Sequence, residues 1–447
     1  FGYDIADRLT SRTMPNGVTS TFEYDGMSRL KRLKHQSSTA TLFDNQYAYN
    51  SANQISQITD MANTRVFGYD LVDRLTSVHT NGTQTESYTF DDVGNRTTSH
   101  LSATYGYQSG KFNQLASTVT ATMQYDANGN IIRKSEGSQV WRYVWDNENR
   151  LTEAATRKQK VRYKYDALGR RVERNFGFKE RTKFTHDGLD VVMDDDNNTG
   201  LTKYQNGLGI DDKLKFSNAG ASSYFLQDHL GSTLGLSNSA ASVNSSASYD
   251  SFGNATGNLA TRYQFTGRER DDFTGLMYYR ARFYDAKPGR FISEDPIDFE
   301  GGDVNLFVYV KNNPVIFTDP LGLLDPIVYE QVARAARCYK KYKFSSVFSG
   351  GNPTVEAALE YVEVGSFSFL ASDGVATTAK ALGKNTASTN PYASGINMLT
   401  RNINRAFGFP KIGGFYPFKY VLKVGDKATP VLAVTGALTL SYNVTTD

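Results

Sequence analysis

An aromatic residue followed by Asp or Asn recurs about every 20 residues over the first 166 residues of the chain. The pairs are Tyr3-Asp4, Tyr24-Asp25, Tyr49-Asn50, Tyr69-Asp70, Phe90-Asp91, Tyr125-Asp126, Trp145-Asp146 and Tyr165-Asp166. A period of this length indicates a repeat architecture, in which each unit leaves an apolar face that only a neighbouring unit can bury. The chain is therefore restricted to folds built by adding similar units side by side.

Within one repeat, the residues predict a strand, a tight turn and a second strand. Tyr163 and Tyr165 fall on one face because side chains alternate along a strand. The Asp that follows can bond to its own backbone two residues further on, and a nearby Gly or Asn accepts the left-handed conformation. Each unit is thus expected to form a hairpin, and successive hairpins a continuous sheet. Ligand binding by the pairs, for instance of sugars, is the alternative, but turn and packing roles already explain the same residues.

The composition suits an all-β chain and excludes several classes of protein. Aromatic residues make up 13% of the chain, almost all of them Tyr and Phe, which fit a pleated, half-buried surface. A net charge of +3 is too small to indicate nucleic acid or a membrane surface as the main partner. The single cysteine, Cys338, excludes an internal disulfide and a thiolate zinc site. No apolar run approaches the roughly 20 residues of a membrane helix.

The chain begins Phe1-Gly2-Tyr3-Asp4, without an initiator Met, a basic segment or the apolar stretch of a secretory signal. This start lies inside a repeat. We therefore expect the chain to be a fragment of a longer polypeptide, and the absence of a signal peptide here does not exclude export.

Residues 176–274 keep the strand-and-turn character without a strict period. The acidic run from Asp194 to Gly200 predicts a solvated hairpin tip, because a calcium loop would need a closing Glu that is missing. His229 next to Asp228 suggests half of a catalytic pair or a capped turn. We favour the turn, since no nucleophile stands at a recognisable spacing.

From residue 275 an ordered set of motifs follows. It runs through Gly275–Asp285, Gly289–Pro296, Gly301-Gly302, Asn305–Tyr309, Asn312–Pro314 and Asp319–Leu323. This set resembles the Rhs repeat-associated core along almost its full length, and the preceding pairs resemble the YD repeats of Rhs proteins, teneurins and Tc-toxin C components. The resemblance implies a mainly β fold, a sheet spiralling into a hollow shell. It divides the chain into YD repeats (1–175), continuing β shell (176–274), core (275–323) and a variable effector-like tail (324–447).

The resemblance also implies chemistry at two Asp-Pro pairs. In this family two aspartates form an acid-protease-like dyad, which here corresponds to Asp295 and Asp319, and the chain is cut between Leu323 and Leu324. Two carboxylates held close cannot both ionise, so one keeps a proton and the pair supplies a base and an acid. The folded chain would present its own bond at high effective concentration. The alternative is that Asp-Pro marks two turns, with Pro fixing φ after a capping Asp.

The family also implicates an arginine, for which Arg282 and Arg290 are the candidates, and we favour Arg282. A fixed cation would keep one carboxylate ionised or stabilise the developing oxyanion. The sequence departs from the family pattern at Asp298, where Gly is common, and this third carboxylate could disturb the dyad. No metal or other cofactor is expected.

The tail changes composition towards Ala, Val and Lys. One helix is expected after Asp325-Pro326 and a second from Asn352-Pro353. The tail contains no His, which argues against His-metal nucleases and His-dependent hydrolases. Cys338 is expected to pack within a helix rather than to act as a nucleophile. Thirteen basic residues against eight acidic ones permit nucleic-acid contact without indicating it.

Together these features predict a bacterial toxin-encapsulating shell that cleaves itself after Leu323 and frees the tail, whose activity the sequence does not reveal. It would be secreted or delivered to a target cell. The expected partners are the tail as enclosed cargo, a delivery apparatus or upstream half of the shell, and a cognate immunity protein. The alternatives are a cell-surface adhesion protein without proteolysis, and a shell with an inactive protease and an inert tail.

Overall fold

The computed structural model describes residues 1–111, 113–177, 180–323, 418–424 and 428–434. It divides into two units, and the first, Phe1–His186 with Asp190–Ile327, contains every strand up to β30. The second contains a hairpin of β31 (Phe418–Val424) and β32 (Ala428–Val434). The helices expected after Asp325 and from Asn352, and Cys338, lie outside the described residues.

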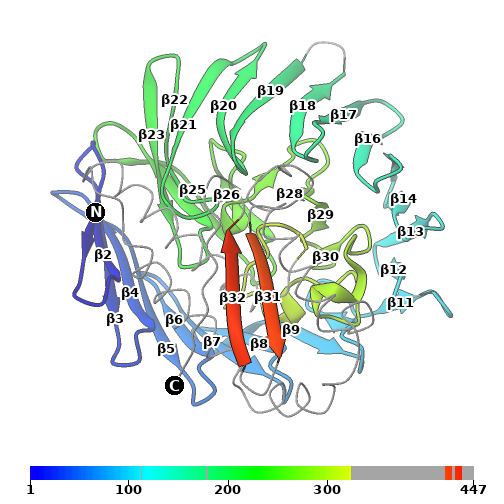
Figure 1. Ribbon diagram of the computed structural model, residues 1–447, viewed down its shortest axis with the longest axis horizontal. Helices are drawn as coiled ribbons and strands as arrows, with labels where there is room; N and C mark the ends of the chain where they lie inside the picture. The colour runs from blue at the N-terminus through cyan, green and yellow to red at the C-terminus, as the bar shows by residue number, and fades with distance from the viewer. Residues whose placement is uncertain (112, 178–179, 324–417, 425–427, 435–447) are drawn as a thin grey trace. The chain divides into compact units, whose positions relative to one another are not determined.

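The repeats form two antiparallel sheets whose strands follow one another in chain order (Figure 1). The ten-stranded sheet consists of β1 (Gly2–Tyr3), β2 (Leu9–Thr13), β3 (Thr19–Tyr24), β4 (Leu30–Gln36), β5 (Thr41–Tyr49), β6 (Ile55–Thr59), β7 (Thr64–Tyr69), β8 (Leu75–Thr80), β9 (Thr83–Phe90) and β10 (Arg96–Ser99). The predicted succession of hairpins is confirmed.

The sixteen-stranded sheet continues the same pattern past the last Tyr-Asp pair. It consists of β11 (Tyr105–Tyr107), β12 (Leu115–Thr118), β13 (Ala121–Tyr125), β14 (Ile131–Glu136), β15 (Gln139–Trp145), β16 (Leu151–Ala155), β17 (Lys160–Tyr165), β18 (Arg171–Phe176), β19 (Glu180–Asp187), β20 (Asp190–Asp196), β21 (Gly200–Asn206), β22 (Lys213–Asn218), β23 (Ala221–Gln227), β24 (Thr233–Ser237), β25 (Val243–Tyr249) and β26 (Ala255–Asn258). The division into two sheets was not predicted.

Each turn repeats the same two backbone hydrogen bonds, and five of the turns add a bond from an Arg side chain, as at Asp166. Its Oδ1 accepts from the backbone N–H groups of Leu168 and Arg170, and its Oδ2 accepts from Arg170 Nε at 2.8 Å. The residue three positions after the Asp or Asn is left-handed in each repeat: it is Gly at 94, 129 and 169, Asn at 53 and 149, and Asp7, Ser28 and Asp73 in the others. Besides the expected Gly and Asn, the turn thus tolerates Ser and Asp there, because its side-chain bonds hold the conformation.

Neighbouring repeats are joined through the same residues. The Tyr165 hydroxyl donates to the Leu151 carbonyl of the preceding repeat at 2.7 Å, and Tyr49 donates likewise to Leu30 at 2.8 Å. The Arg150 guanidinium lies over the Tyr165 ring, 5.1 Å from its centroid. The aromatic-Asp pair and the Arg therefore connect each unit to the next, which explains the period.

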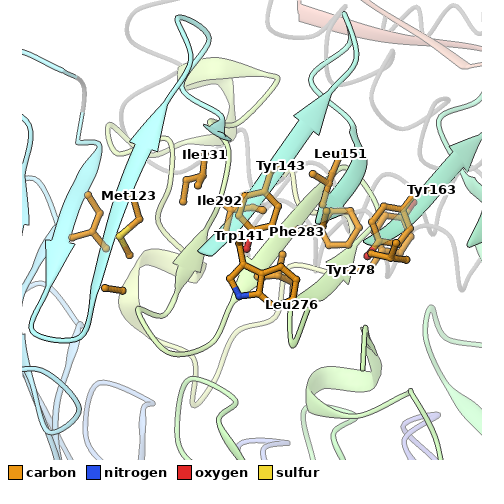
Figure 2. Packing of buried hydrophobic residues seen from close by; sticks show 14 of the residues in the cluster. Met123, Ile131, Trp141, Tyr143, Leu151, Tyr163, Leu276, Tyr278, Phe283 and Ile292 are labelled. Atoms are coloured by element: carbon orange, nitrogen blue, oxygen red, sulfur yellow. The ribbon is translucent and has the colours of Figure 1, made fainter. Parts of the chain in front are cut away.

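Alternate strand residues form the core, as Figure 2 shows for the largest cluster. Trp141 and Tyr143 are buried, whereas Arg142 and Val144, which alternate with them along the strand, are exposed. Tyr163 and Tyr165 contribute to the same cluster, as the period-two pattern predicts. A second cluster joins side chains of β4 to β9 in the ten-stranded sheet.

Residues 265–323 are called the core segment; they include the core that the sequence predicts at 275–323. Its small sheet comprises β27 (Glu269–Arg270), β28 (Met277–Tyr279), β29 (Arg282–Asp285) and β30 (Arg290–Phe291), and its 3₁₀ turns are η1 (Phe265–Gly267), η2 (Asp298–Gly301) and η3 (Val310–Asn312). Four of its side chains lie within the large cluster: Leu276, Tyr278, Phe283 and Ile292 (Figure 2). The described residues include no helix long and apolar enough to span a membrane.

The run from Asp194 to Gly200 forms the predicted turn between β20 and β21, where Asp196 caps the backbone of Asn198 and Thr199. The expectation that this run is solvated is wrong for Asp194. That side chain is buried and forms an ion pair with Arg262, because its strand faces the core.

Candidate active site

Three of the predicted site residues come together in the core segment. Arg282 begins β29, Asp295 follows β30, and Asp319 lies after η3. The side chains of the three residues are buried, with relative exposures of 3%, 8% and 4% respectively. The fold therefore brings two carboxylates and a guanidinium from three separate stretches of chain into one water-poor site.

The Arg282 guanidinium is the centre of this arrangement. Its Nη2 atom lies 2.9 Å from Asp295 Oδ2 and 3.5 Å from Asp319 Oδ2. Its Nε donates to the Gly322 carbonyl at 2.6 Å, and its Nη1 donates to the Leu306 carbonyl at 2.9 Å. Four acceptors thus fix one cation, and the two carboxylate oxygens reach the same nitrogen.

The other oxygen of each carboxylate caps its own turn. Asp319 Oδ1 accepts from the backbone N–H of Gly322 at 2.8 Å and of Leu323 at 3.2 Å. Asp295 Oδ1 accepts from the Ile297 N–H at 3.1 Å. In each aspartate, Oδ1 therefore caps a turn, as the alternative interpretation of Asp-Pro expects, while Oδ2 faces Arg282.

The surroundings of Asp295 favour its protonated form. Burial raises the pKa of Asp295 to about 7, although the nearby Arg282 cation and the Ile297 N–H lower it. The charges of Asp319 and Asp298 raise the pKa of Asp295 further. Asp298, the departure from the family pattern, thus adds to the same shift, and Asp295 is close to half-protonated at neutral pH.

A cavity of about 30 Å³ adjoins these groups, enough for one or two water molecules. It is lined by Arg282, Asp295, Asp298, Gly301, Asp303, Asn305, Leu306, Val308, Val310, Lys311 and Asp319. A water molecule there would lie beside both carboxylates, which is the position of an attacking nucleophile in a dyad mechanism.

Gly301 lies between the Asp295 carboxylate and the Leu323 carbonyl, which belongs to the expected scissile bond. A Cβ atom at Gly301 would lie 3.0 Å from Asp295 Oδ2 and 3.3 Å from the Leu323 carbonyl oxygen. The carbonyl and the carboxylate therefore border the same small space. Leu324, the expected residue on the other side of the bond, lies outside the described residues.

Arg290, the second candidate arginine, is elsewhere. Its Nη2 donates to the Asn113 carbonyl at 2.7 Å, and its guanidinium lies 4.8 Å from the Phe307 ring centroid. It connects the core segment to the turn before β12 and contacts neither carboxylate by any interaction described here. Of the two arginines, only Arg282 lies at the dyad.

His229 occupies a capped turn, the interpretation that the sequence favoured. Asp228 accepts from the backbone of Leu230 and Ser232, and His229 Nε2 lies 2.8 Å from the Val315 carbonyl oxygen. Burial lowers the pKa of His229, which keeps it neutral. Among the described residues, no group of three or more His, Cys, Asp or Glu side chains could hold a metal ion.

Sequence reasoning missed Gly301 and the Leu306 carbonyl. Gly301-Gly302 is visible within the motif, but which of the two glycines lies against the carboxylate depends on the fold. The Leu306 carbonyl leaves no signal in the sequence, because every residue type has a backbone carbonyl.

The ladder of aspartate-capped hairpins and the enclosed core segment define a YD-repeat shell. The teneurin YD-shell family matches residues 3–315, so the chain belongs to this family. The predicted fold class, a mainly β YD-repeat shell, is confirmed.

Two relatives are similar over most of the chain. The tRNA nuclease WapA of Bacillus subtilis (strain 168) is 31% identical over 395 residues, covering 81% of this chain and 16% of the relative. The probable deoxyribonuclease RhsA of Dickeya dadantii (strain 3937) is 25% identical, covering 72% of this chain and 24% of the relative. The chain thus spans less than a quarter of either protein's length.

Among solved structures, the crystal structure of TcdB2-TccC3-Cdc42 has a TM-score of 0.59 and 19% identity, covering 72% of this chain and 19% of that one. At this identity the likeness shows the fold. Taken with the family match and the relatives, the chain is an Rhs/YD shell of the kind found in polymorphic toxins.

Proposed function

We propose that this shell cleaves its own chain between Leu323 and Leu324 through the dyad of Asp295 and Asp319. The contact of Arg282 Nη2 with both carboxylates carries the proposal, because it holds them together in a buried site. The Leu323 N–H bonded to Asp319 supports it, since this bond fixes the residue that precedes the cut.

In this mechanism, a water molecule attacks the Leu323 carbonyl carbon. Ionised Asp319, which accepts two backbone N–H bonds, takes a proton from the water. Protonated Asp295, whose pKa is raised to about 7, gives its proton to the developing oxyanion. Asp319 then gives the proton it took from water to the Leu324 nitrogen while Asp295 takes a proton back from the tetrahedral intermediate, and the C–N bond breaks, leaving a carboxylate on Leu323 and a free amine on Leu324.

Arg282 supports the reaction in two ways. It offsets the negative charge that two buried carboxylates would otherwise share. It also fixes the Gly322 carbonyl at 2.6 Å, which orients the peptide leading into the scissile bond. Both effects depend on a rigid guanidinium with several donors, so Lys would replace only part of this role.

The product of the cut gives the protein its biological role in this proposal. Residues 324–447 are the enclosed cargo, an effector freed from its covalent link to the shell. Relatives described as nucleases and a toxin, and a structural neighbour from a Tc toxin, support a shell that is secreted or delivered to a target cell. A delivery apparatus or upstream shell half, and an immunity protein protecting the producer, are the partners that follow.

Intact mass spectrometry of the purified chain tests the cleavage. We expect two products in the wild type, one ending at Leu323 and one beginning at Leu324, and one uncut chain in D295N and in D319N. D166N is the matched control, because Asp166 caps an equivalent turn in a repeat and should leave cutting unchanged. An uncut wild type would contradict the protease and favour an adhesion protein or an inert shell with the same fold.

A further inference from the structure

The segment that carries Asp319 is attached to the ten-stranded sheet. Asn312 Nδ2 donates to the Gly94 carbonyl at 2.9 Å, and Asn313 Nδ2 donates to the Asp73 carbonyl at 2.9 Å. Both carbonyls belong to repeat turns, one between β9 and β10 and the other between β7 and β8. Val315 then enters the hydrophobic cluster of that sheet.

The segment that carries Asp295 is attached to the sixteen-stranded sheet. The Ile131 N–H donates to the Ile292 carbonyl at 3.0 Å, and Arg290 donates to the Asn113 carbonyl at 2.7 Å. Ile292 also lies within the hydrophobic cluster of β11 to β17 (Figure 2). The two carboxylates are thus carried by segments attached to different sheets. The Asp319 segment has two further contacts: His229, in the turn between β23 and β24, contacts the Val315 carbonyl, and the Ala281 N–H donates to the Leu321 carbonyl at 3.2 Å.

The backbone between these attachments is strained. Val310, Lys311 and Asn312 all have positive φ, at 43°, 53° and 59°, and they form the 3₁₀ turn η3. A left-handed conformation is unfavourable for an L-residue, most of all for a β-branched residue such as Val310. Such a turn persists only where its surroundings hold it. Two of its residues, Val310 and Lys311, line the cavity beside the dyad.

We propose that Asn312 and Asn313 are positioning residues that make self-cleavage conditional on the folded ten-stranded sheet. Their amides hold the strained turn against the repeat turns at Gly94 and Asp73, and this places Asp319 beside Asp295. An incomplete sheet would leave the dyad apart and the tail covalently attached. This inference rests on the proposed cleavage and adds the condition under which it occurs.

Substitutions that suit the same backbone conformation test the role of the side-chain amides of Asn312 and Asn313. N312D and N313D keep the size of the side chain and, at 312, a residue type that tolerates positive φ, but they place a carboxylate oxygen against a carbonyl. N312G keeps the left-handed preference and removes the side chain. N81D is the matched control, because Asn81 is also left-handed in the ten-stranded sheet and donates to Asn63, away from the core segment.

The rate of cutting is followed by intact mass during cell-free synthesis of the full chain. We expect N312D, N313D and N312G to cut at least about tenfold more slowly than the wild type, since small displacements of reacting groups cost that much or more. N81D should cut at the wild-type rate. A wild-type rate in N312D and N312G would overturn the inference, as would equal slowing in N81D.

The pH dependence of the rate distinguishes positioning from general destabilisation. If Asp319 is displaced, its charge no longer raises the pKa of Asp295, so the alkaline limb of the N312G profile, in which no charge is added, should move to lower pH. An unchanged profile at a reduced rate would contradict positioning. Failure of the proposed cleavage itself is a different result, namely an uncut wild type.

Discussion

Aspartate turns occur in both the repeats and the core segment, but the pKa of the carboxyl is lowered at Asp166 in a repeat and raised at Asp295 in the core segment. In the repeats, Asp166 bonds to Arg170 four residues later, and hydrogen bonds from Arg170 lower the pKa of the carboxyl against the effect of partial burial. In the core segment the equivalent fourth residues are Phe299 and Leu323, so neither aspartate has an Arg at that position.

The consequence is that Asp295 and Asp319 must share Arg282, which is distant in sequence and buried. Burial then dominates at Asp295 and raises its pKa to about 7. The turn at Asp166 thus has its charge neutralised locally, whereas the turns at Asp295 and Asp319 carry the two carboxylates of the proposed dyad.

Replacing the arginine of each region should give the largest difference. R282Q should abolish cutting and lower the free energy of unfolding by about 3–5 kcal/mol, because it leaves two buried carboxylates without their cation. R170Q should leave cutting unchanged and cost about 0.5 kcal/mol, since its ion pair with Asp166 is partly exposed. Intact mass and urea denaturation, with uncut D319N as the stability reference, provide the measurements. Equal costs in the two regions would contradict the comparison.

Filling the space beside the dyad should have a smaller effect. G301A introduces a Cβ 3.0 Å from Asp295 Oδ2 and 3.3 Å from the Leu323 carbonyl oxygen, and separating them should slow cutting about tenfold. G26A is the control, because no atom lies within 4 Å of a Cβ at that repeat turn. Normal cutting by G301A would show that the carbonyl need not approach Asp295 so closely.

Giving Asp295 a repeat-like partner should have the smallest effect. F299R places a cation four residues after Asp295, at a side chain that is exposed. The cation favours the ionised carboxylate and lowers its pKa, so the protonated form is lost at lower pH. The alkaline limb of the rate profile should move to lower pH, and cutting at pH 7 should slow about threefold. F299Q is the uncharged control, and identical profiles for the two variants would contradict this interpretation.

The repeat fold was predictable because the residues that define it act within one unit. An aromatic, an Asp and an Arg at fixed spacing, as in Tyr165, Asp166 and Arg170, make contacts that recur with the period. The boundary between the two sheets was not predictable, since β10 and β11 lie within the same run of repeats.

The candidate site was predictable as a set of residue types but not as a geometry. The motif resemblance indicated Asp295 and Asp319 and favoured Arg282 over Arg290, but the sequence alone does not show which guanidinium reaches the carboxylates. Only the pairing of β29 with β28 and β30 directs Arg282 to the dyad. The close approach of Gly301 to Asp295 and to the Leu323 carbonyl likewise arises from tertiary packing.

The most direct test of the account is to let the wild-type chain fold in heavy-oxygen water and to measure the mass of its N-terminal product. A dyad that activates water predicts a product ending at Leu323, with one heavy oxygen atom in its new carboxylate. An uncut chain, a product with a different end, or a product at Leu323 without the label would contradict hydrolysis by Asp295 and Asp319.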